Sequence, residues 1–469
     1  MAQSTPPPVV HLDLEARRAL GRDARRTMPR AAHADWHPTA DRPDPVALIA
    51  GQETNRVPEL LPIRHERMLA SPFTFYRGAA ILMAADLATQ PDTGLRVQCC
   101  GDAHLANFGG FAAPDRQIVF DMNDFDETNP GPFEWDVKRL VASFELAWRE
   151  NGFSRKEGRK IVVNTATAYR RGMRDFAAMG NLDLWYSRLD VDGVIARWGA
   201  GLSQEVLDRF LRNVGKAQAK NSLRAFDKLT EVVDGQHRIK ADPPLIVPVR
   251  DQSDDPEAVA AWLHDRFRVY RHSLQPDRRH LLEGYRIVDV ARKVVGVGSV
   301  GTRCWIILLL GRDDQDPLFI QVKEANESVL EPHSGRSGFA SHGQRVVEGQ
   351  RLLQSAGDIL LGWTTARSVD GVERDFYLRQ LWDGKLAPDY QTMGPEVMRV
   401  FGEICARTLA RGHARSGDRV AIDAYLGKND EFDDAMGDFA AAYAEQNQRD
   451  YDAVRAALES GRLAPAAPA

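Results

Sequence analysis

Cysteine is scarce in this chain of 469 residues, which contains four of them and no C-x-x-C spacing. Zinc sites of the finger and ribbon type use such spacings, so the sequence does not indicate one. Two of the four, Cys99 and Cys100, are neighbours in the chain, which is a poor arrangement for a disulfide between them. Free thiols are typical of a reducing compartment, and we therefore expect a cytoplasmic protein.

The sequence also lacks a long apolar run and an excess of positive charge. Its longest aliphatic run, at residues 305–310, is far too short to span a membrane, and residues 1–26 contain no apolar segment typical of a signal peptide. The formal net charge of −5 gives no basic field for nucleic acid. We expect a protein that is neither secreted nor embedded in a membrane and that does not bind nucleic acid.

What the sequence does have is length and an ordinary composition. Hydrophobic residues make up 43% and charged residues 27%, which is typical of a globular protein, and 469 residues suffice for two or three domains or lobes. Changes in composition along the chain predict four regions. They are a mobile N-terminal arm at 1–55, a mainly helical lobe at 56–290, a β-rich lobe at 291–390, and C-terminal helices at 391–460 that complete the helical lobe. The expected fold class is α+β.

Local patterns predict individual elements within these regions. Apolar residues at helical spacing favour one helix around residues 74–89. A strand is expected from Gln117 to Met122, followed by an acidic turn and a helix through residues 135–151. Residues 155–290 are predicted to be mainly helical, with a polar surface excursion at 234–258.

The segment GVGSVGT places Gly296, Gly298 and Gly301 in a G-x-G-x-x-G pattern between two β-rich runs. A dinucleotide-binding fold needs a helix directly after these glycines, whereas this sequence continues as a strand. In a kinase-type hairpin the glycines instead let backbone amides approach nucleotide phosphates, a role that falls here to the amides around Gly298 and Ser299. A plain tight hairpin is the alternative that the pattern alone leaves open.

Lys323 follows the glycines on the next expected strand, within the apolar run PLFIQVKEA. A kinase-type hairpin is followed by a strand lysine that binds the phosphates, so this residue type fits its position. A buried lysine needs a counter-charge, and Glu348 on the helix expected from Gly343 is the candidate partner. The alternative for Glu348 is a solvated helix face.

The segment GDAHLANF combines three polar side chains, Asp102, His104 and Asn107, within six residues. Asp102 and Asn107 are five residues apart. The same interval separates two residues of a kinase catalytic loop, the aspartate that accepts the substrate's hydroxyl proton and the asparagine that holds magnesium. The segment therefore predicts a catalytic loop with Asp102 as its base.

An acidic turn, DMNDFDET, follows the next strand and offers carboxylates to a hard cation that prefers oxygen ligands. Asp124 precedes a phenylalanine, as in the metal-binding turn of kinases, and Asp121 and Asp126 are the alternative ligands. Two other interpretations remain open at this point. One is an acidic turn that only caps the next helix, and the other is a two-metal phosphoesterase site.

Several of these segments together resemble known families. CGDAHLANFG, DMNDFDET, GPFEWDVKRL, GVGSVGTR, QVKEA and ARGHARSGD resemble the bacterial domain-of-unknown-function family 2252, over about residues 64–451. GDAHLANF, VFDMNDFD and GPFEWD are also similar to motifs of aminoglycoside and choline kinases in the protein-kinase-like superfamily. The second resemblance implies that Asp102 is catalytic, that Asn107 and Asp124 bind the metal, and that Asp136 braces the catalytic loop. Cys100 stands where these kinases have a histidine.

The order of the motifs departs from the kinase order. In kinases the Gly-rich loop and the lysine precede the catalytic loop, whereas Gly296 and Lys323 follow Asp102 by roughly two hundred residues. The resemblance therefore implies a circularly permuted, two-lobed protein-kinase-like fold. Such a permutation is physically tolerable because chain termini usually lie at the surface.

Two further polar segments carry alternatives. In GHARSGD, His413 or Asp418 would replace the missing histidine or contact substrate together with Arg415. The alternative is a helix end at which histidine and arginine stabilise exposed carbonyl groups. In FTFYRG, Arg77 is interpreted as the anchor of a helix start, with a phosphate contact as the alternative.

The leading hypothesis is an ATP- and Mg²⁺-dependent phosphotransferase in which Asp102 positions and deprotonates an acceptor hydroxyl. The alternatives are a nucleotide-binding pseudokinase, a nucleotidyl transferase and a metal-dependent phosphoesterase. The expected partners are a nucleotide and an acceptor, either a small molecule or a protein. The sequence indicates neither the acceptor nor the oligomeric state.

Overall fold

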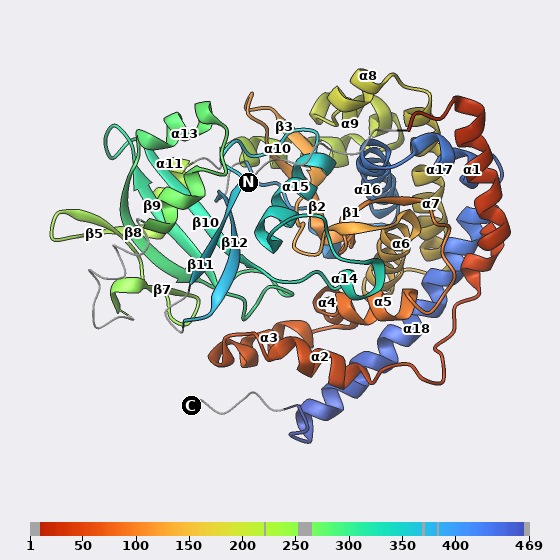
Figure 1. Ribbon diagram of the computed structural model, residues 1–469, viewed down its shortest axis with the longest axis horizontal. Coiled ribbons are helices and arrows are strands. Elements are labelled where there is room, and N and C mark those ends of the chain that lie inside the picture. The colour runs from red at the N-terminus through yellow and green to blue at the C-terminus, as the bar shows by residue number, and fades with distance from the viewer. Residues whose placement is uncertain (1–9, 220–221, 252–264, 368–370, 382–383, 464–469) are drawn as a thin grey trace.

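The computed structural model describes residues 10–219, 222–251, 265–367, 371–381 and 384–463 of the chain. A strand-rich part lies at one end of the molecule and a cluster of long helices at the other (Figure 1). This mixed architecture confirms the predicted α+β class. None of the helices in the described ranges combines the length and the apolar character needed to cross a bilayer.

The elements follow the chain in this order. The helices are α1 (Leu14–Thr27), α2 (Pro45–Glu53), α3 (Leu61–Met68), α4 (Pro72–Gly78), α5 (Ala80–Leu87), α6 (Phe133–Glu150), α7 (Arg155–Ala177), α8 (Asn181–Tyr186), α9 (Val191–Trp198), α10 (Gln204–Gln218), α11 (Ser222–Leu229), α13 (Pro276–Glu283), α14 (Glu331–Ser334), α15 (His342–Leu353), α16 (Pro395–Ser416), α17 (Arg419–Leu426) and α18 (Glu431–Glu459). Three strand pairs lie outside the large sheet: β1 (Arg96–Cys99) with β4 (Asn129–Pro132), β2 (Phe108–Ala112) with β3 (Ile118–Met122), and β5 (Thr230–Val233) with β6 (Gln236–Ile239).

A six-stranded sheet forms the strand-rich part, in the order β11-β12-β10-β9-β8-β7 with antiparallel pairing throughout. Its strands are β7 (Ile246–Pro248), β8 (Arg286–Lys293), β9 (Cys304–Leu310), β10 (Pro317–Ala325), β11 (Gly362–Arg367) and β12 (Glu373–Gln380). The Gly-rich loop at residues 294–303 connects β8 to β9, between two strands as predicted. Lys323 on β10 pairs with Cys304 on one side and with Tyr377 on the other.

Both faces of the sheet are packed, which explains why its strands carry successive aliphatic residues rather than a strict alternation. On one face Ile320 belongs to a cluster with Tyr270, and on the other Phe319 belongs to a cluster with Phe226 of α11. Side chains two residues apart share a face of a strand. Lys323 therefore lies on the same face of β10 as Phe319.

Helix α6 lies within the helical part, with α7, α16 and α18 packed against it (Figure 1). Every residue from Phe133 to Trp148 is buried, so the helix is surrounded by protein along most of its length. Five of these buried residues are charged: Glu134, Asp136, Lys138, Arg139 and Glu145. Because buried charges require partners, charged side chains of this helix can hold polar groups of neighbouring segments in place.

The N-terminal region differs from the predicted mobile arm. It forms α1 and α2, and α1 packs along α17, where Arg17 and Asp418 form an ion pair at 2.9 Å. Trp36 is 2% exposed and packs edge-on against Tyr443 of α18. The prediction was wrong because the contacts that order this region come from the other end of the chain.

Two other predicted boundaries also differ. The helix predicted around residues 74–89 is divided into α4 and α5, because Ala79 between them leaves helical backbone at φ −123° and ψ 38°. The polar section at 234–258 contains β6 and β7, and its residues 252–258 lie outside the described ranges. Since β7 is an edge strand of the large sheet, the β-rich part begins before residue 291.

Candidate functional site

A polar cleft of about 350 Å³ lies where the Gly-rich loop meets the loop at residues 100–107 and the acidic turn at 123–128. Eight of the predicted site residues line it: Asp102, His104, Asn107, Asp124, Asp126, Gly296, Gly298 and Ser299. The fold thus gathers the two predicted loops and the acidic turn around one space.

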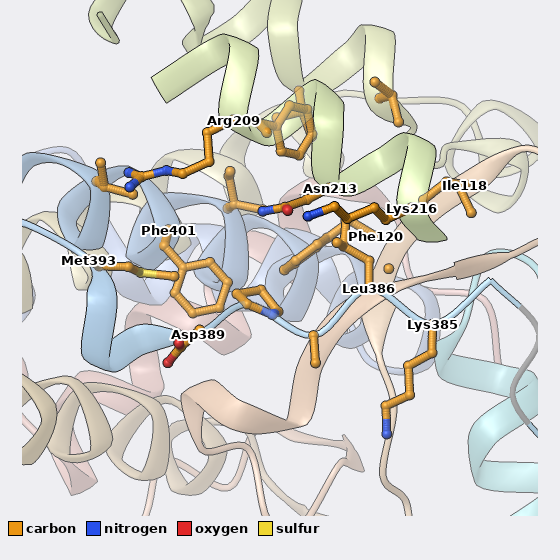
Figure 2. Close-up of a pocket in the computed structure, with 18 of the residues that line it drawn as sticks. Ile118, Phe120, Arg209, Asn213, Lys216, Lys385, Leu386, Asp389, Met393 and Phe401 are labelled. Carbon is orange, nitrogen blue, oxygen red and sulfur yellow. The ribbon is translucent and has the colours of Figure 1, made fainter. Parts of the chain in front are cut away.

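A larger cavity of about 980 Å³ lies elsewhere, between α10, α16 and the segment at residues 385–393 (Figure 2). Its walls are mainly apolar, with Ile118, Phe120, Leu386, Met393 and Phe401 among them. The residues that line it include none of the predicted site residues. We assign the candidate site to the smaller polar cleft, because titratable side chains and eight of the predicted site residues gather there.

The loop at residues 100–107 follows β1 and is held by Asp136 of α6. The Asp136 carboxylate accepts hydrogen bonds from the backbone N–H of Cys100 at 2.6 Å and of Gly101 at 3.0 Å. Gly101 has a φ of +86°, and a side chain there would come within 2.0 Å of the carbonyl oxygen of Glu127, so only glycine fits. The kinase resemblance gives Asp136 the role of a loop brace, and these are the contacts that such a role requires.

His413 on α16 supports this brace from the other side. Its Nε2 lies 3.0 Å from the Oδ2 of Asp136, and its Nδ1 lies 2.8 Å from the hydroxyl of Tyr169. All three side chains are buried, so packing fixes the network. The nearby thiol of Cys100 is buried too, and it contacts the carbonyl oxygen of Asp124 at 3.2 Å. His413 therefore contacts the brace and does not line the cleft.

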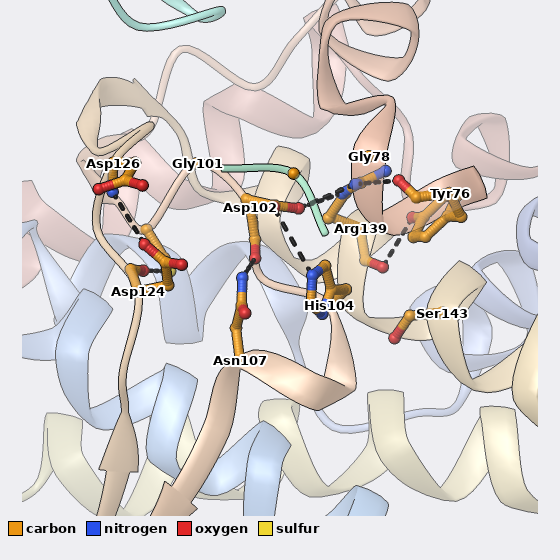
Figure 3. Close-up of polar contacts among 12 residues, drawn as sticks. Tyr76, Gly78, Gly101, Asp102, His104, Asn107, Asp124, Asp126, Arg139 and Ser143 are labelled. Carbon is orange, nitrogen blue, oxygen red and sulfur yellow. Dashed lines mark hydrogen bonds and ion pairs between the residues drawn. The ribbon is translucent and has the colours of Figure 1, made fainter. Parts of the chain in front are cut away.

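Asp102 lies at the cleft with Arg139 behind it (Figure 3). The Oδ1 of Asp102 accepts a hydrogen bond from Arg139 Nε at 2.9 Å and lies 2.8 Å from Arg139 Nη2, which also donates to the carbonyl of Tyr76. The Oδ2 of Asp102 lies 3.6 Å from the Nε2 of His104. Asn107 donates its Nδ2 to the backbone carbonyl of Asp102 at 2.8 Å. The two residues predicted to act together are thus directly joined.

Lys323 does not line the cleft itself but contacts the acidic turn beside it. Its Nζ lies 2.6 Å from the Oδ2 of Asp126 and 3.9 Å from the Oδ1 of Asp124. Tyr377, its cross-strand neighbour, donates its hydroxyl to the Oδ1 of Asp126 at 2.6 Å. Ser299 donates to the Oδ2 of the same carboxylate at 3.3 Å. Asp126 therefore links the sheet, the Gly-rich loop and the acidic turn.

Burial and neighbouring charges shift the pKa values of this group in different directions. Burial raises the pKa of Asp124, and the charge of Asp126 adds to the rise. For Asp126 the effect of burial is outweighed by the ammonium of Lys323 and by hydrogen bonds from Lys323 and Tyr377, which hold its pKa below the usual value. Despite its own burial, Lys323 has a raised pKa because of the two carboxylates. At neutral pH a charged Lys323 therefore lies beside an ionised Asp126, and Asp126 lines the cleft.

The pKa values on the loop side of the cleft follow the same causes. Burial raises the pKa of Asp102, although the charge of Arg139 opposes the rise. Burial, together with the charges of Arg77 and Arg139, holds the pKa of His104 well below its usual value, so His104 is neutral. Burial also raises the pKa of Glu127, which lines the cleft, to about 7. A carboxylate with a raised pKa is a better proton acceptor, which suits Asp102 to a role as base.

The Gly-rich loop is held through its carbonyl oxygens. Arg64 donates to the carbonyl of Gly298 at 2.9 Å, and the N–H of Val57 donates to that of Gly301 at 2.8 Å. Within the described ranges, the N–H groups of Gly298 and Ser299 have no hydrogen-bond acceptor in the protein. The loop is thus fixed by one set of backbone groups while another set remains available to a ligand.

Two predicted contacts differ in the structure. Glu348 forms an ion pair with Arg351 at 3.0 Å, so the predicted pairing of Glu348 with Lys323 is wrong, and Asp126 takes that place. Asp121 is fully buried in an ion pair with Arg411 and does not line the cleft. It is therefore not placed to bind a metal there.

Arg415 and Asp418 have structural contacts away from the cleft. The guanidinium of Arg415 lies 4.0 Å from the ring centroid of Trp185. Asp418 caps α17 by accepting hydrogen bonds from the N–H groups of Val420 and Ala421. Of the GHARSGD segment, only His413 reaches the site, through the loop brace.

Sequence reasoning missed Arg139, Tyr377 and Arg64. Arg139 could have been found from the sequence. It lies three residues after Asp136, and this spacing places both side chains on the same face of the predicted helix. Tyr377 is brought to Lys323 only by strand register, and Arg64 reaches the Gly-rich loop from a helix more than two hundred residues earlier, at a separation of 234.

A divalent cation would find few ligands here. Within the described ranges, no group of three or more His, Cys, Asp and Glu side chains is arranged to hold a metal. Mg²⁺ usually needs only one or two carboxylates and completes its shell with waters and substrate phosphates. Asp124 and Asn107 both line the cleft and offer oxygen ligands of this kind. The donor set fits a sparsely held Mg²⁺ better than a zinc or a two-metal centre.

Comparison with known proteins gives one match. The sequence profile of the family described as "Uncharacterized protein conserved in bacteria (DUF2252)" matches residues 56–457, which include all of the cleft residues described above. No match was found among curated proteins or among solved structures. The family description names no activity, so the function must be argued from the cleft.

Proposed function

This chain belongs to the DUF2252 family of bacterial proteins, and from the chemistry of its polar cleft we propose that it is an ATP- and Mg²⁺-dependent phosphotransferase. The acceptor is a hydroxyl group of a small molecule or a protein. The lobes correspond to those of a protein-kinase-like fold, with their order along the chain circularly permuted.

One observation carries the proposal. Lys323 of the sheet lies 2.6 Å from Asp126 and 3.9 Å from Asp124, although 197 residues separate Lys323 from Asp126 along the chain. A kinase requires a strand lysine, a Gly-rich loop and a metal-binding aspartate at one nucleotide site. Only the permuted arrangement predicts that these motifs meet in this order. Their meeting at the polar cleft therefore supports it.

The proposed roles follow from the contacts. Asp102 orients the acceptor hydroxyl and takes its proton, and Arg139 fixes the orientation of Asp102 from behind. Lys323 and the free N–H groups of Gly298 and Ser299 bind phosphate oxygens. Because phosphoryl transfer depends mainly on positioning and electrostatic stabilisation, the two braced loops are as important as the base.

Asn107 and Asp124 would hold the Mg²⁺ ion, which, when bound, neutralises charge on the phosphates. Both residues line the cleft, and the Asn107 amide is already oriented by its bond to the Asp102 carbonyl. The four cysteines are buried and free, which supports the expected location in a reducing cytoplasm.

An ATP-consumption assay with Mg²⁺ tests this function on the full chain. With water as the acceptor of the phosphoryl group, the wild type should release ADP and inorganic phosphate slowly, and Asp102→Ala should lower the rate by about a hundredfold or more while leaving thermal stabilisation by Mg-ATP in place. Asp115→Ala, at an aspartate outside the cleft, serves as the control and should keep the wild-type rate. Full activity of Asp102→Ala, or a wild type that does not bind Mg-ATP, would overturn the proposal.

The Asp102–Arg139 pair favours a second candidate, nucleotide binding without turnover. The charge of Arg139 opposes the rise in the pKa of Asp102 and so makes Asp102 a weaker base than it would be without the pair. This candidate predicts stabilisation by Mg-ATP without ADP release. The same pair of measurements separates it from the leading proposal.

A further inference from the structure

Arg77 lies in the last turn of α4 and lines the polar cleft. Its guanidinium forms no hydrogen bond and no ion pair with any residue of the described ranges, and its Nε is buried without a partner. Arg56, the other arginine that lines the cleft, donates to the carbonyl of Val300 at 2.5 Å, and the nearby Lys323 and Arg139 pair with Asp126 and Asp102. An arginine kept at the wall of a cleft without a counter-ion is costly unless a ligand supplies one.

The fold holds Arg77 directly against the Gly-rich loop. Arg64, which is fully buried, donates to the carbonyl of Gly298 at 2.9 Å and to that of Gly78 at 3.2 Å. It thereby ties the loop to the residue that follows Arg77. The backbones are so close that a side chain at position 298 would come within 3.2 Å of the carbonyl oxygen of Arg77. Glycine at 298 is what permits this approach.

Three donor groups that remain available here favour an anion. They are the guanidinium of Arg77 and the backbone N–H groups of Gly298 and Ser299, which have no acceptor within the described ranges. Successive backbone N–H groups form concave sites for anions, and a guanidinium binds oxyanions through two parallel donors. Asp102 also lines the cleft, and because its carboxylate repels an anion, the favoured position of the anion is on the loop side, away from Asp102.

We propose that Arg77, together with the N–H groups of Gly298 and Ser299, forms a binding subsite for a phosphoryl group. A phosphoryl group fits better than a carboxylate because it presents several oxygens, enough for the fork of the guanidinium and for two amides at once. The subsite itself rests on the geometry of the cleft. The identification of the phosphoryl group as part of a nucleotide rests on the proposed function.

Binding of inorganic tripolyphosphate to the full chain in the presence of Mg²⁺, measured by calorimetry, tests the subsite without the base or the sugar. Arg77→Met should weaken the binding by about tenfold to a hundredfold, as expected for loss of a charge-assisted hydrogen bond, and Arg77→Lys should weaken it less. Since Arg77 has no protein partner, Arg77→Met should keep or raise the melting temperature. If Arg77 had a merely structural role, Arg77→Met would lower both the tripolyphosphate affinity and the melting temperature.

Arg67→Met is the matched control, because Arg67 donates to the carbonyl of Gly296 at 2.9 Å but does not line the cleft. Its tripolyphosphate affinity should stay within about threefold of the wild type, since no charge-assisted bond to the ligand is lost. Equal affinity of wild type and Arg77→Met for both tripolyphosphate and phenyl phosphate, no binding of either probe by the wild type, or equal losses in Arg77→Met and Arg67→Met would overturn the subsite.

A second arm identifies the source of the phosphoryl group. Phenyl phosphate, which imitates a phosphorylated acceptor, is titrated into the chain with Mg-ADP present. Because ADP lacks the γ-phosphate of ATP, no γ-phosphate competes with phenyl phosphate for the subsite. If Arg77→Met weakens tripolyphosphate binding, the subsite takes a nucleotide phosphate, and if it weakens only phenyl phosphate binding, the subsite takes a phosphorylated acceptor. Tripolyphosphate binding through Arg77 in a chain that shows no ADP release would retain the subsite and remove the proposed function.

Discussion

Replacing Asp136 with asparagine is expected to loosen the loop at residues 100–107 from helix α6. The carboxylate accepts hydrogen bonds from the N–H groups of Cys100 at 2.6 Å and Gly101 at 3.0 Å, and its Oδ2 lies 3.0 Å from the Nε2 of His413. Asparagine keeps the shape but has one acceptor oxygen, so one backbone N–H must face an amide NH₂. A hydrogen bond to a charged group contributes about 1.5–3 kcal/mol, and opening of the loop should become easier by that amount.

Amide hydrogen exchange of peptides that span the loop measures this change directly. The expected loss corresponds to roughly tenfold to hundredfold faster exchange of the Cys100 and Gly101 amides in Asp136→Asn. Asp418→Asn is the control, because Asp418 also accepts two backbone N–H bonds, at 3.1 and 3.0 Å, but caps α17 outside the cleft. Its effect should be confined to the start of α17 and to α1, which Arg17 holds against Asp418. Equal protection of the loop in wild type and Asp136→Asn would refute the reasoning.

Three further predictions concern stability, each measured by urea unfolding. Gly101→Ala places a methyl group 2.0 Å from a backbone carbonyl oxygen and should lower the free energy of unfolding by more than about 2 kcal/mol. Gly94→Ala, also at positive φ but with nothing within 4 Å, should lower it by about 1 kcal/mol. Similar losses in the two variants would contradict this prediction. Arg139→Met leaves Asp102 without its ion pair and should cost about 3 kcal/mol, so an unchanged midpoint would count against it. Burial raises the pKa of Glu134 from 4.5 to about 7, so the folded state binds this proton more tightly and the free energy of unfolding should fall as pH rises between those values. Glu134→Gln should remove the decrease in the free energy of unfolding that Glu134 causes. An identical pH dependence in wild type and variant would show that Glu134 is not its cause.

The parts of the site that depend on local patterns were predictable from the sequence. The glycines at 296–301 lie between two strands, and Lys323 follows on the next one, because β-branched and aliphatic runs bounded by glycine specify strands locally. The interval between Asp102 and Asn107 is a short-range feature as well, and the structure joins the two by a hydrogen bond of 2.8 Å. A motif with fixed spacing within one loop can be recognised without knowledge of the tertiary structure.

Partners that are distant in the sequence were not predictable in the same way. Glu348 was selected as the partner of Lys323 by analogy of position, but the register of β10 and β12 and the path of the acidic turn bring Asp126 there instead. The mobile arm was a wrong prediction for a related reason, since Arg17 is fixed by Asp418 at a separation of 401 residues. Such contacts depend on how helices and sheet pack, which no short window of sequence contains.

The central claim is that the Gly-rich loop and the acidic turn bind the phosphates of one nucleotide. A crystal structure with Mg²⁺ and a non-hydrolysable ATP analogue tests it most directly. The account predicts phosphates between Ser299 and Asp124, with Lys323 on a phosphate oxygen and the terminal phosphate facing Asp102. A nucleotide bound in the apolar cavity beside Phe401, or phosphates without contact to Lys323 and Asp124, would contradict it.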